Sequence, residues 1–325
     1  MSPILGITGI GGGPIGLPLV GGSAGLPYFG GRGVFASGND GNSGWTYANV
    51  IDYITISSTG NATDFGDLTI APSGTGSFNG NGRGCCGGGW DENAGGPTNV
   101  IGYITIASAG NATDFGDLTV ARRLCKGMSD GTIGVWSCGL DASTNSNVID
   151  YVTVATLGNA TDFGNGTIAA YARGCASNGV LGLSAGGRAG GTRYSEIDYI
   201  TFANQTDATD AGDLSQDRQG AAGTSDGTTG IFGGGFTSSS RVDTIDYLTI
   251  DTSSNASDFG NLTQARQYAG ACSDGTKAVW GGGYYQSPLY GVNIIDYVTI
   301  SSTGNASDFG DLTADRSGVS SCSGD

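Results

Sequence analysis

The chain has 325 residues, a formal net charge of −16 and no histidine, and 63 of its residues are glycine. The negative charge disfavours nucleic acid and anionic bilayers as partners, because both repel an acidic protein. Without histidine, a Ser-His-Asp triad and a histidine-ligated metal are excluded. Charged residues make up only 13 % of the chain, and Asp, Asn, Ser, Thr and Gly crowd between short apolar runs, which is typical of an all-β protein.

Residues 1–31 form an uncharged segment that matches no other part of the chain. Its aliphatic residues are flanked by Gly or Pro, so it can form neither a regular helix nor a core of its own. Such a segment is either disordered or laid along a partner as extended chain, and its apolar content favours the second reading. We therefore expect an N-terminal docking arm with no membrane insertion, whose contact residues are Ile4, Leu5, Ile7, Ile10, Ile15, Leu17, Leu19 and Val20.

One pattern returns throughout residues 32–325, which we expect to form a single domain. Its most regular stretch runs from Asn49 to Thr69 and includes Ile-Asp-Tyr and Gly-Asn-Ala-Thr-Asp-Phe-Gly-Asp-Leu-Thr. The anchoring tyrosines are Tyr53, Tyr103, Tyr151, Tyr199, Tyr247 and Tyr297. By subtraction they lie 50, 48, 48, 48 and 50 residues apart, a period that is typical of propellers and related repeat arrays.

Each unit predicts four short strands, most clearly at residues 268–272, 277–280, 295–300 and 308–312. The Asp-Gly pair at 274–275 favours a tight hairpin between the first two strands. The array opens at residues 33–38 with a second strand and closes at residues 316–322 with a first strand. We therefore expect the two ends to share one sheet, which removes the open edges that invite aggregation.

The pattern resembles the kelch repeat over residues 32–325. The shared features are an Arg before the first strand, a double or triple Gly closing the second, a Tyr-Asp-like pair in the third, and an aromatic residue followed by Leu. The resemblance implies a six-bladed, kelch-like β-propeller of four-stranded blades, closed by pairing of the N-terminal and C-terminal strands. The departures are Ile-Asp-Tyr in place of the usual tyrosine placement, and phenylalanine where tryptophan is typical, as at Phe65 and Phe309.

Features that recur in every unit indicate architecture rather than chemistry. Asp64, Asp67 and their repeats could indicate calcium, but side chains of this kind also bond turn amides, and their repetition favours turns. Most Asn-X-Ser/Thr sequences are copies of the repeat turn. One arginine per unit is expected to pair with nearby carbonyls or aspartates, at Arg122, Arg173, Arg218, Arg266 and Arg316. The seven cysteines, an odd number, are expected to be buried free thiols.

The loop between the second and third strands differs from unit to unit and carries most of the aromatic residues outside the repeat. Variable loops on a rigid scaffold are where recognition usually occurs. The candidate binding residues are Trp45, Tyr47, Trp90, Tyr194, Phe236, Tyr284, Tyr285 and Tyr290. These rings are equally compatible with packing onto the unit below.

Glu92 and Glu196, the two glutamates, belong to different loops, so we expect no catalytic residues, no metal, no cofactor and no enzyme. The repeat also resembles repeat proteins of marine and cyanobacterial tailed phages. That resemblance implies a non-enzymatic structural or adsorption protein of the virion surface, docked through residues 1–31 to other virion proteins or to copies of itself. Its rim would bind a host glycan or protein. The alternatives are a freestanding extracellular glycan-binding propeller and a polysaccharide-acting enzyme.

Overall fold

The computed structural model describes residues 29–40, 46–286 and 289–325. Within these ranges the protein consists of antiparallel sheets and turns without a helix, which confirms the all-β prediction. Accordingly, the described chain holds no helix long and apolar enough to cross a membrane. The eight arm residues and Trp45 lie outside the described residues.

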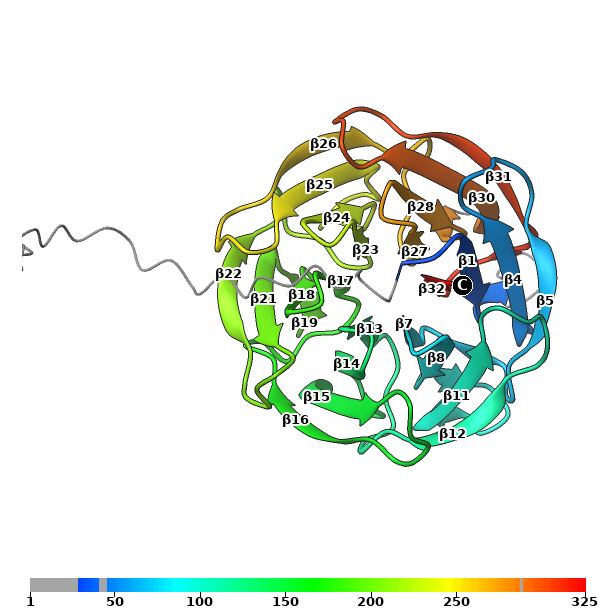
Figure 1. The fold of residues 1–325 in the computed structure, drawn as a ribbon. Helices are drawn as coiled ribbons and strands as arrows, with labels where there is room; N and C mark the ends of the chain where they lie inside the picture. The colour runs from blue at the N-terminus through cyan, green and yellow to red at the C-terminus, as the bar shows by residue number, and fades with distance from the viewer. Residues whose placement is uncertain (1–28, 41–45, 287–288) are drawn as a thin grey trace, which may run out of the picture.

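Six sheets account for most of the strand residues, and their strands follow here from the innermost to the outermost in Figure 1. The first contains β32 (Ser320–Gly324), β1 (Arg32–Ala36), β4 (Val50–Thr55) and β5 (Thr63–Asp67). The second contains β7 (Gly76–Gly80), β8 (Arg83–Gly87), β11 (Val100–Thr105) and β12 (Thr113–Asp117). The third contains β13 (Lys126–Ser129), β14 (Ile133–Leu140), β15 (Asn145–Thr153) and β16 (Thr161–Asn165).

The remaining sheets continue in the same order. The fourth contains β17 (Gly174–Ser177), β18 (Leu181–Ala185), β21 (Glu196–Thr201) and β22 (Thr209–Asp213). The fifth contains β23 (Ala222–Ser225), β24 (Thr229–Gly233), β25 (Thr244–Thr249) and β26 (Ser257–Asn261). The sixth contains β27 (Gly270–Ser273), β28 (Lys277–Gly281), β30 (Leu289–Thr299) and β31 (Ser307–Arg316), with β29 (Tyr284–Gln286) also paired to β30.

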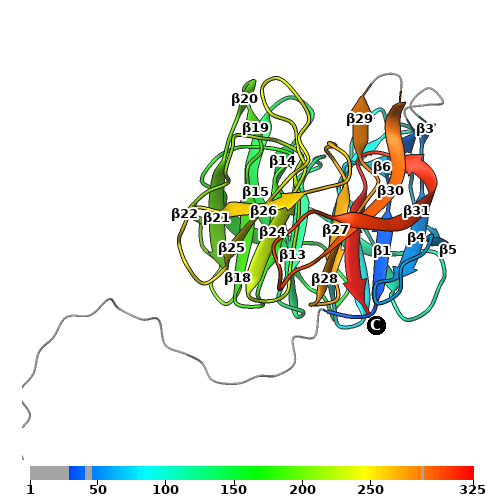
Figure 2. The same cartoon turned by 90° about the horizontal axis from the view of Figure 1, so that it is seen from above.

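The sheets stand side by side around a common centre (Figure 1). Each innermost strand contacts the innermost strands of both neighbouring sheets. Short strands extend one end of the ring, which we call the hairpin end, and the C-terminus lies at the opposite end (Figure 2). The short strands are β2 (Asn39–Asp40), β3 (Thr46–Tyr47), β6 (Pro72–Ser73), β9 (Trp90–Asp91), β10 (Gly96–Pro97), β19 (Arg188–Ala189) and β20 (Thr192–Arg193).

The first sheet joins the two ends of the repeat array. β1 pairs with β32 from Arg32 opposite Gly324 to Ala36 opposite Ser320, and its other edge pairs with β4. This pairing confirms that the last strand of the chain completes the sheet in which the array begins. The sheet edge that each terminal strand would otherwise expose is therefore covered by the other.

A ring of backbone hydrogen bonds encircles the centre where the inner strands begin. Within each unit one equivalent residue has a positive φ, between 54° and 71°. Its N–H donates to the carbonyl of its counterpart in the preceding unit, over 2.6 to 3.1 Å. The members of this axial ring are Gly74, Leu124, Ala172, Gly220, Tyr268 and Gly318, and the N–H of Gly74 donates to Gly318, which closes it.

Buried arginine–aspartate ion pairs also link neighbouring units. The Nη1 of Arg122 lies 2.7 Å from the carboxylate of Asp150, and both side chains are fully buried. Thr119, at the end of the preceding unit, donates its N–H and its hydroxyl to the same carboxylate. The described residues contain five such pairs, which confirms the expected role of the repeated arginines: Arg122–Asp150, Arg173–Asp198, Arg218–Asp246, Arg266–Asp296 and Arg316–Asp52.

Two units depart from this arrangement. The prediction that the arginines recur at one place per unit is wrong for Arg173, which stands three residues beyond the equivalent position, occupied by Ala170. Its guanidinium still reaches Asp198, 2.9 Å away, because Ala170 leaves room where most of the other units have an arginine side chain. In the second unit Gly102 replaces the aspartate and Pro72 the arginine. Losing both partners avoids an isolated buried charge, which would be strongly destabilising.

The repeat turns clip neighbouring sheets together at the outside of the ring. The side chain of Asn61 accepts a hydrogen bond from the backbone N–H of Asp311 on β31, and Asn111 accepts one from Asp67 on β5. Equivalent bonds recur around the ring, with Asp207 in place of asparagine in the fourth unit. These asparagines therefore have the structural role expected of a repeated turn.

All seven cysteines are free, and all except the partly buried Cys86 are buried. Burial raises the pKa of Cys85 and of Cys175 to about 12. The expected buried thiols are thus confirmed for six of the seven. Glycine makes room for the aromatic side chains beside them, since a Cβ at Gly87 would lie 2.8 Å from the fully buried indole of Trp136.

The axial ring predicts opposite effects at two of its positions. A left-handed conformation costs an alanine about 1 kcal/mol, so Ala172→Gly should raise the free energy of unfolding by about that amount. Gly318→Ala should lower it by more, because the new Cβ would lie 2.4 Å from the Ser73 hydroxyl. Urea denaturation measures both changes. Gly110→Ala, where a Cβ meets nothing within 4 Å, is the control, and equal effects at all three sites would contradict the prediction.

The ion pairs predict strong coupling between their partners. Asp246→Ala leaves the buried guanidinium of Arg218 without its carboxylate and should cost about 3–5 kcal/mol of stability. Replacing both, as Arg218→Met with Asp246→Leu, should recover at least half of that loss, as the second unit suggests. A double-mutant cycle in urea measures the coupling. A double variant no more stable than Asp246→Ala would show that the unpaired charge of Arg218 is not the cause of the lost stability.

Candidate functional site at the hairpin end

Seven of the eight predicted binding residues are described, and all lie at the hairpin end. Tyr47 is on β3, Trp90 on β9, Tyr284 and Tyr285 on β29, and Tyr290 on β30. Tyr194 and Phe236 are in the corresponding loops of the fourth and fifth units. Each of the seven is partly buried rather than fully exposed. The rings therefore pack partly onto the array while keeping a surface at this end.

A cavity of about 370 Å³ opens among these loops. It brings together three of the predicted residues, Tyr47, Trp90 and Tyr284. Tyr194, Phe236, Tyr285 and Tyr290 do not line it. Two arginines that were not among the predicted residues, Arg123 and Arg241, also line it. So do four members of the axial ring, on the side facing the hairpins: Gly74, Leu124, Tyr268 and Gly318. No carboxylate lies in its described wall.

The aromatic rings of this end are stacked with guanidinium groups. The Cζ of Arg123 lies 4.6 Å from the centre of the Trp90 ring, and that of Arg241 lies 4.2 Å from Tyr284. The Phe236 ring contacts two arginines, whose Cζ atoms lie 4.6 Å (Arg193) and 5.3 Å (Arg241) from its centre. The rings thus hold the arginines in place by cation–π contact and by apolar packing of their stems.

Of the 13 basic residues of the chain, nine have a place elsewhere in the ring. Five form the buried ion pairs, and three extend across to backbone carbonyls of a neighbouring sheet: Arg32, Arg83 and Lys277. Lys126 faces the centre. The four that remain all belong to the hairpin end, and the Nε of each is buried without a hydrogen bond in the described structure: Arg123, Arg188, Arg193 and Arg241.

Carboxylates near this end have other partners. The carboxylate of Asp91 accepts the N–H of Asn93, and that of Asp141 accepts the N–H groups of Ser143 and Thr144. Those backbone hydrogen bonds lower the pKa of Asp141. These two aspartates are bonded to their own turns, and none of the four arginines forms an ion pair within the described residues.

Tyr268 supplies a neutral polar group to the cavity wall. Its Oη accepts a hydrogen bond of 2.7 Å from the amide of Gln219, and burial raises the pKa of Tyr268 to about 12. It therefore stays protonated at neutral pH and keeps its own O–H to donate. Burial, followed by the nearby charge of Glu92, also raises the pKa of Tyr47.

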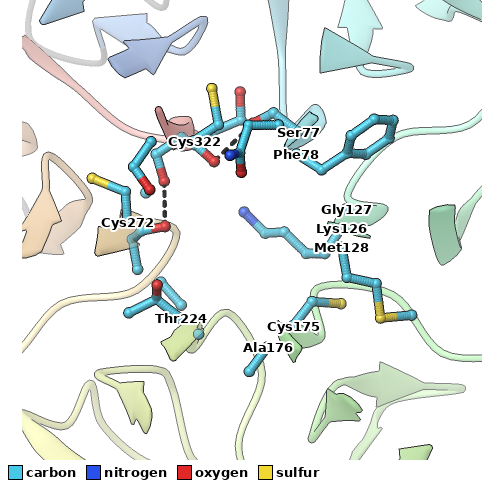
Figure 3. A pocket seen from close by; sticks show the side chains of 18 of the residues that line it. Ser77, Phe78, Lys126, Gly127, Met128, Cys175, Ala176, Thr224, Cys272 and Cys322 are labelled. Carbon is cyan, nitrogen blue, oxygen red and sulfur yellow. Dashed lines mark hydrogen bonds between the residues drawn. The ribbon is translucent and has the colours of Figure 1, made fainter. Parts of the chain in front are cut away.

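A second cavity lies at the centre, on the opposite side of the axial ring, with a volume of about 90 Å³ (Figure 3). The side chain of Lys126 extends into it, whereas the equivalent residues of the other units are small: Gly76, Gly174, Ala222, Gly270 and Ser320. Burial lowers the pKa of Lys126. Cys175, Cys272 and Cys322 also line the cavity.

The described residues contain no group of three or more His, Cys, Asp and Glu side chains that could hold a metal ion. The two glutamates lie in different units. Glu92 follows β9, whereas Glu196 begins β21 and accepts a hydrogen bond from the Thr167 hydroxyl. What the hairpin end offers is hydrogen-bond donors and positive charge around a cavity.

Comparison with known proteins identifies no family for the chain. No protein-family model matches the chain, and a search of the curated proteins finds no match.

Sequence reasoning found the aromatic residues but missed the arginines they hold. Arg123 follows directly on Arg122, which belongs to a buried pair, so the two look alike in the sequence. One signal was available: the repeat accounts for one arginine per unit, and Arg188, Arg193 and Arg241 fall outside it, in the variable loops. Lys126, a cation where the other units have Gly, Ala or Ser, was a second such signal.

Proposed function

We propose that the protein is a six-bladed, kelch-like β-propeller whose four-stranded blades are the six sheets. The support is the cyclic contact of the inner strands, the axial ring that passes once through every unit, and the pairing of β1 with β32. Propellers commonly use such a rigid scaffold to present loops at one end of a central axis.

The proposed function of the scaffold is non-enzymatic recognition at the hairpin end. The observation that carries this proposal is the cavity of about 370 Å³, a size within the usual range of ligand sites, among loops that differ from unit to unit. Its wall combines the aromatic rings of Tyr47, Trp90 and Tyr284 with arginine side chains. Aromatic residues and arginine are the types most enriched at the centres of binding interfaces.

The proposed location is a virion surface. The support is the resemblance of the repeat to those of tailed-phage proteins, together with the apolar composition of residues 1–31. Burying one aliphatic side chain contributes about 1.5–3 kcal/mol, so several such residues laid along a neighbouring subunit would hold the protein on a particle. The hairpin end, opposite the C-terminus (Figure 2), would then face a cell-surface glycan or protein. A freestanding glycan-binding propeller is the second candidate, since the cavity would serve it equally.

The location predicts that the intact protein is found on purified particles and that the arm holds it there. Antibody-gold labelling in the electron microscope should decorate particles from the source material. A variant lacking residues 1–28 should keep its thermal stability, because it retains every described strand and the hydrogen bonds of Gly31 to Ile56 and Asp325. It should not be incorporated. Protein found only in the particle-free fraction, or a truncated variant incorporated at the parental level, would contradict the proposal.

A further inference from the structure

The geometry points to an acidic ligand at the hairpin end. We propose that the cavity between Arg123 and Arg241 binds a carboxylate-bearing sugar residue of an acidic glycan. This inference rests on the proposed recognition function and specifies the chemistry that the site would read.

The distribution of charge is the first argument. In a chain with a net charge of −16, a cavity wall that holds two arginines and no carboxylate is an unusual composition. Neither arginine takes part in any of the ion pairs of the described residues. Partly buried cations are costly without a counter-charge, so a bound anion would supply what the protein itself does not.

The stacking of the arginines is the second argument. The guanidinium Cζ atoms of Arg123 and Arg241 lie over the ring faces of Trp90 and Tyr284. A guanidinium stacked through its face keeps its N–H groups in its own plane, where they remain free to donate. Each ring therefore fixes the orientation of a fork of donors that matches the two oxygens of a carboxylate. With their faces covered in this way, these rings are better placed to position arginines than to stack on a neutral sugar.

The rest of the wall favours a sugar over an acidic peptide. Beside the arginines lie the amides of Asn39 and Gln267 and the hydroxyls of Ser317 and Tyr268. The hydroxyl of Ser317 donates to the Oδ1 of Asn39, whereas the O–H of Tyr268 and the amide N–H groups are donors that can bond several hydroxyls of one sugar ring. A glutamate side chain offers only its carboxylate. A nucleic acid is disfavoured because the net charge of the protein repels a continuous phosphate backbone.

The experiment compares one sugar in two charge states. Isothermal titration calorimetry with trigalacturonate, with its methyl ester, and with a panel of sialylated, uronate and sulfated oligosaccharides measures the affinity of the full-length protein. We expect an acidic saccharide to bind, and the neutralised form of the same saccharide to bind at least about tenfold more weakly, as for the loss of a charge-assisted hydrogen bond. Tetraglutamate tests the peptide alternative and should bind more weakly than the best acidic sugar.

Matched variants locate the binding. Arg123→Gln and Arg241→Gln should each weaken binding at least about tenfold. Arg193→Gln removes the same charge from the same end but does not line the cavity, so its affinity should change by less than about threefold, as expected for a screened charge. Equal melting temperatures show that all three variants fold, and if Arg241→Gln does not, Arg123→Gln alone carries the test.

Several results would overturn the inference. These are equal binding of acid and methyl ester, equal losses in all three variants, tetraglutamate binding as tightly as the sugars, or no binding by any acidic saccharide. Binding of neutral glycans that is insensitive to Arg123 would overturn this inference and leave the proposed recognition function intact. Absence of the protein from particles would contradict the proposed location and leave this inference intact.

Discussion

The closure of the ring by backbone hydrogen bonds is the constraint on which the rest of the structure depends. Six equivalent residues, one per unit, each donate to the preceding one, and the last bond joins Gly74 to Gly318 across most of the chain. All six have a positive φ, and the N–H of each points to the preceding unit. Leu124, Ala172 and Tyr268 adopt this conformation although it is costly for residues other than glycine. Such strain persists only where the surrounding structure determines it.

Because the ring is closed at its centre, the loops at the hairpin end can differ from unit to unit. The axial ring and the outer clips recur around the ring, and within the described residues buried ion pairs are present in five of the six units. The loops beyond β8, β18 and β24 bridge to the ring near their first residues, at Trp90, Arg188 and Phe236, and can vary beyond these bridges. Those loops and their counterparts supply Arg241 and the aromatic rings of the candidate site, and Arg123 comes from the segment before β13. The four arginines with no place in the ring are thereby gathered at the hairpin end, and two of them line the cavity. This is how a strongly acidic protein can present a site for an anion.

The repeated strands could be predicted from the sequence, whereas the contacts between residues that do not repeat could not. A period near fifty residues, the Asp-Gly turns and the split first unit were enough to predict the strands and the pairing of β1 with β32. The positive φ of Tyr268 could not be predicted, because nothing local favours that conformation for tyrosine and tertiary closure imposes it. The role of Arg123 depends on Trp90, which lies in a different unit, so their contact is invisible until the ring is closed. Of the seven described aromatic residues that were predicted, three line the cavity, since the sequence does not show which side of its loop each ring occupies.

Closure can be tested most directly by measuring amide hydrogen exchange at the residues of the axial ring. If one cooperative ring holds the structure, their N–H groups should exchange only through global unfolding and with the same free energy, including that of Gly74, whose partner is Gly318 near the other end of the chain. Deuterium uptake resolved by nuclear magnetic resonance gives that free energy residue by residue. Fast exchange at Gly74, with the other five N–H groups protected, would show an open array and contradict the account.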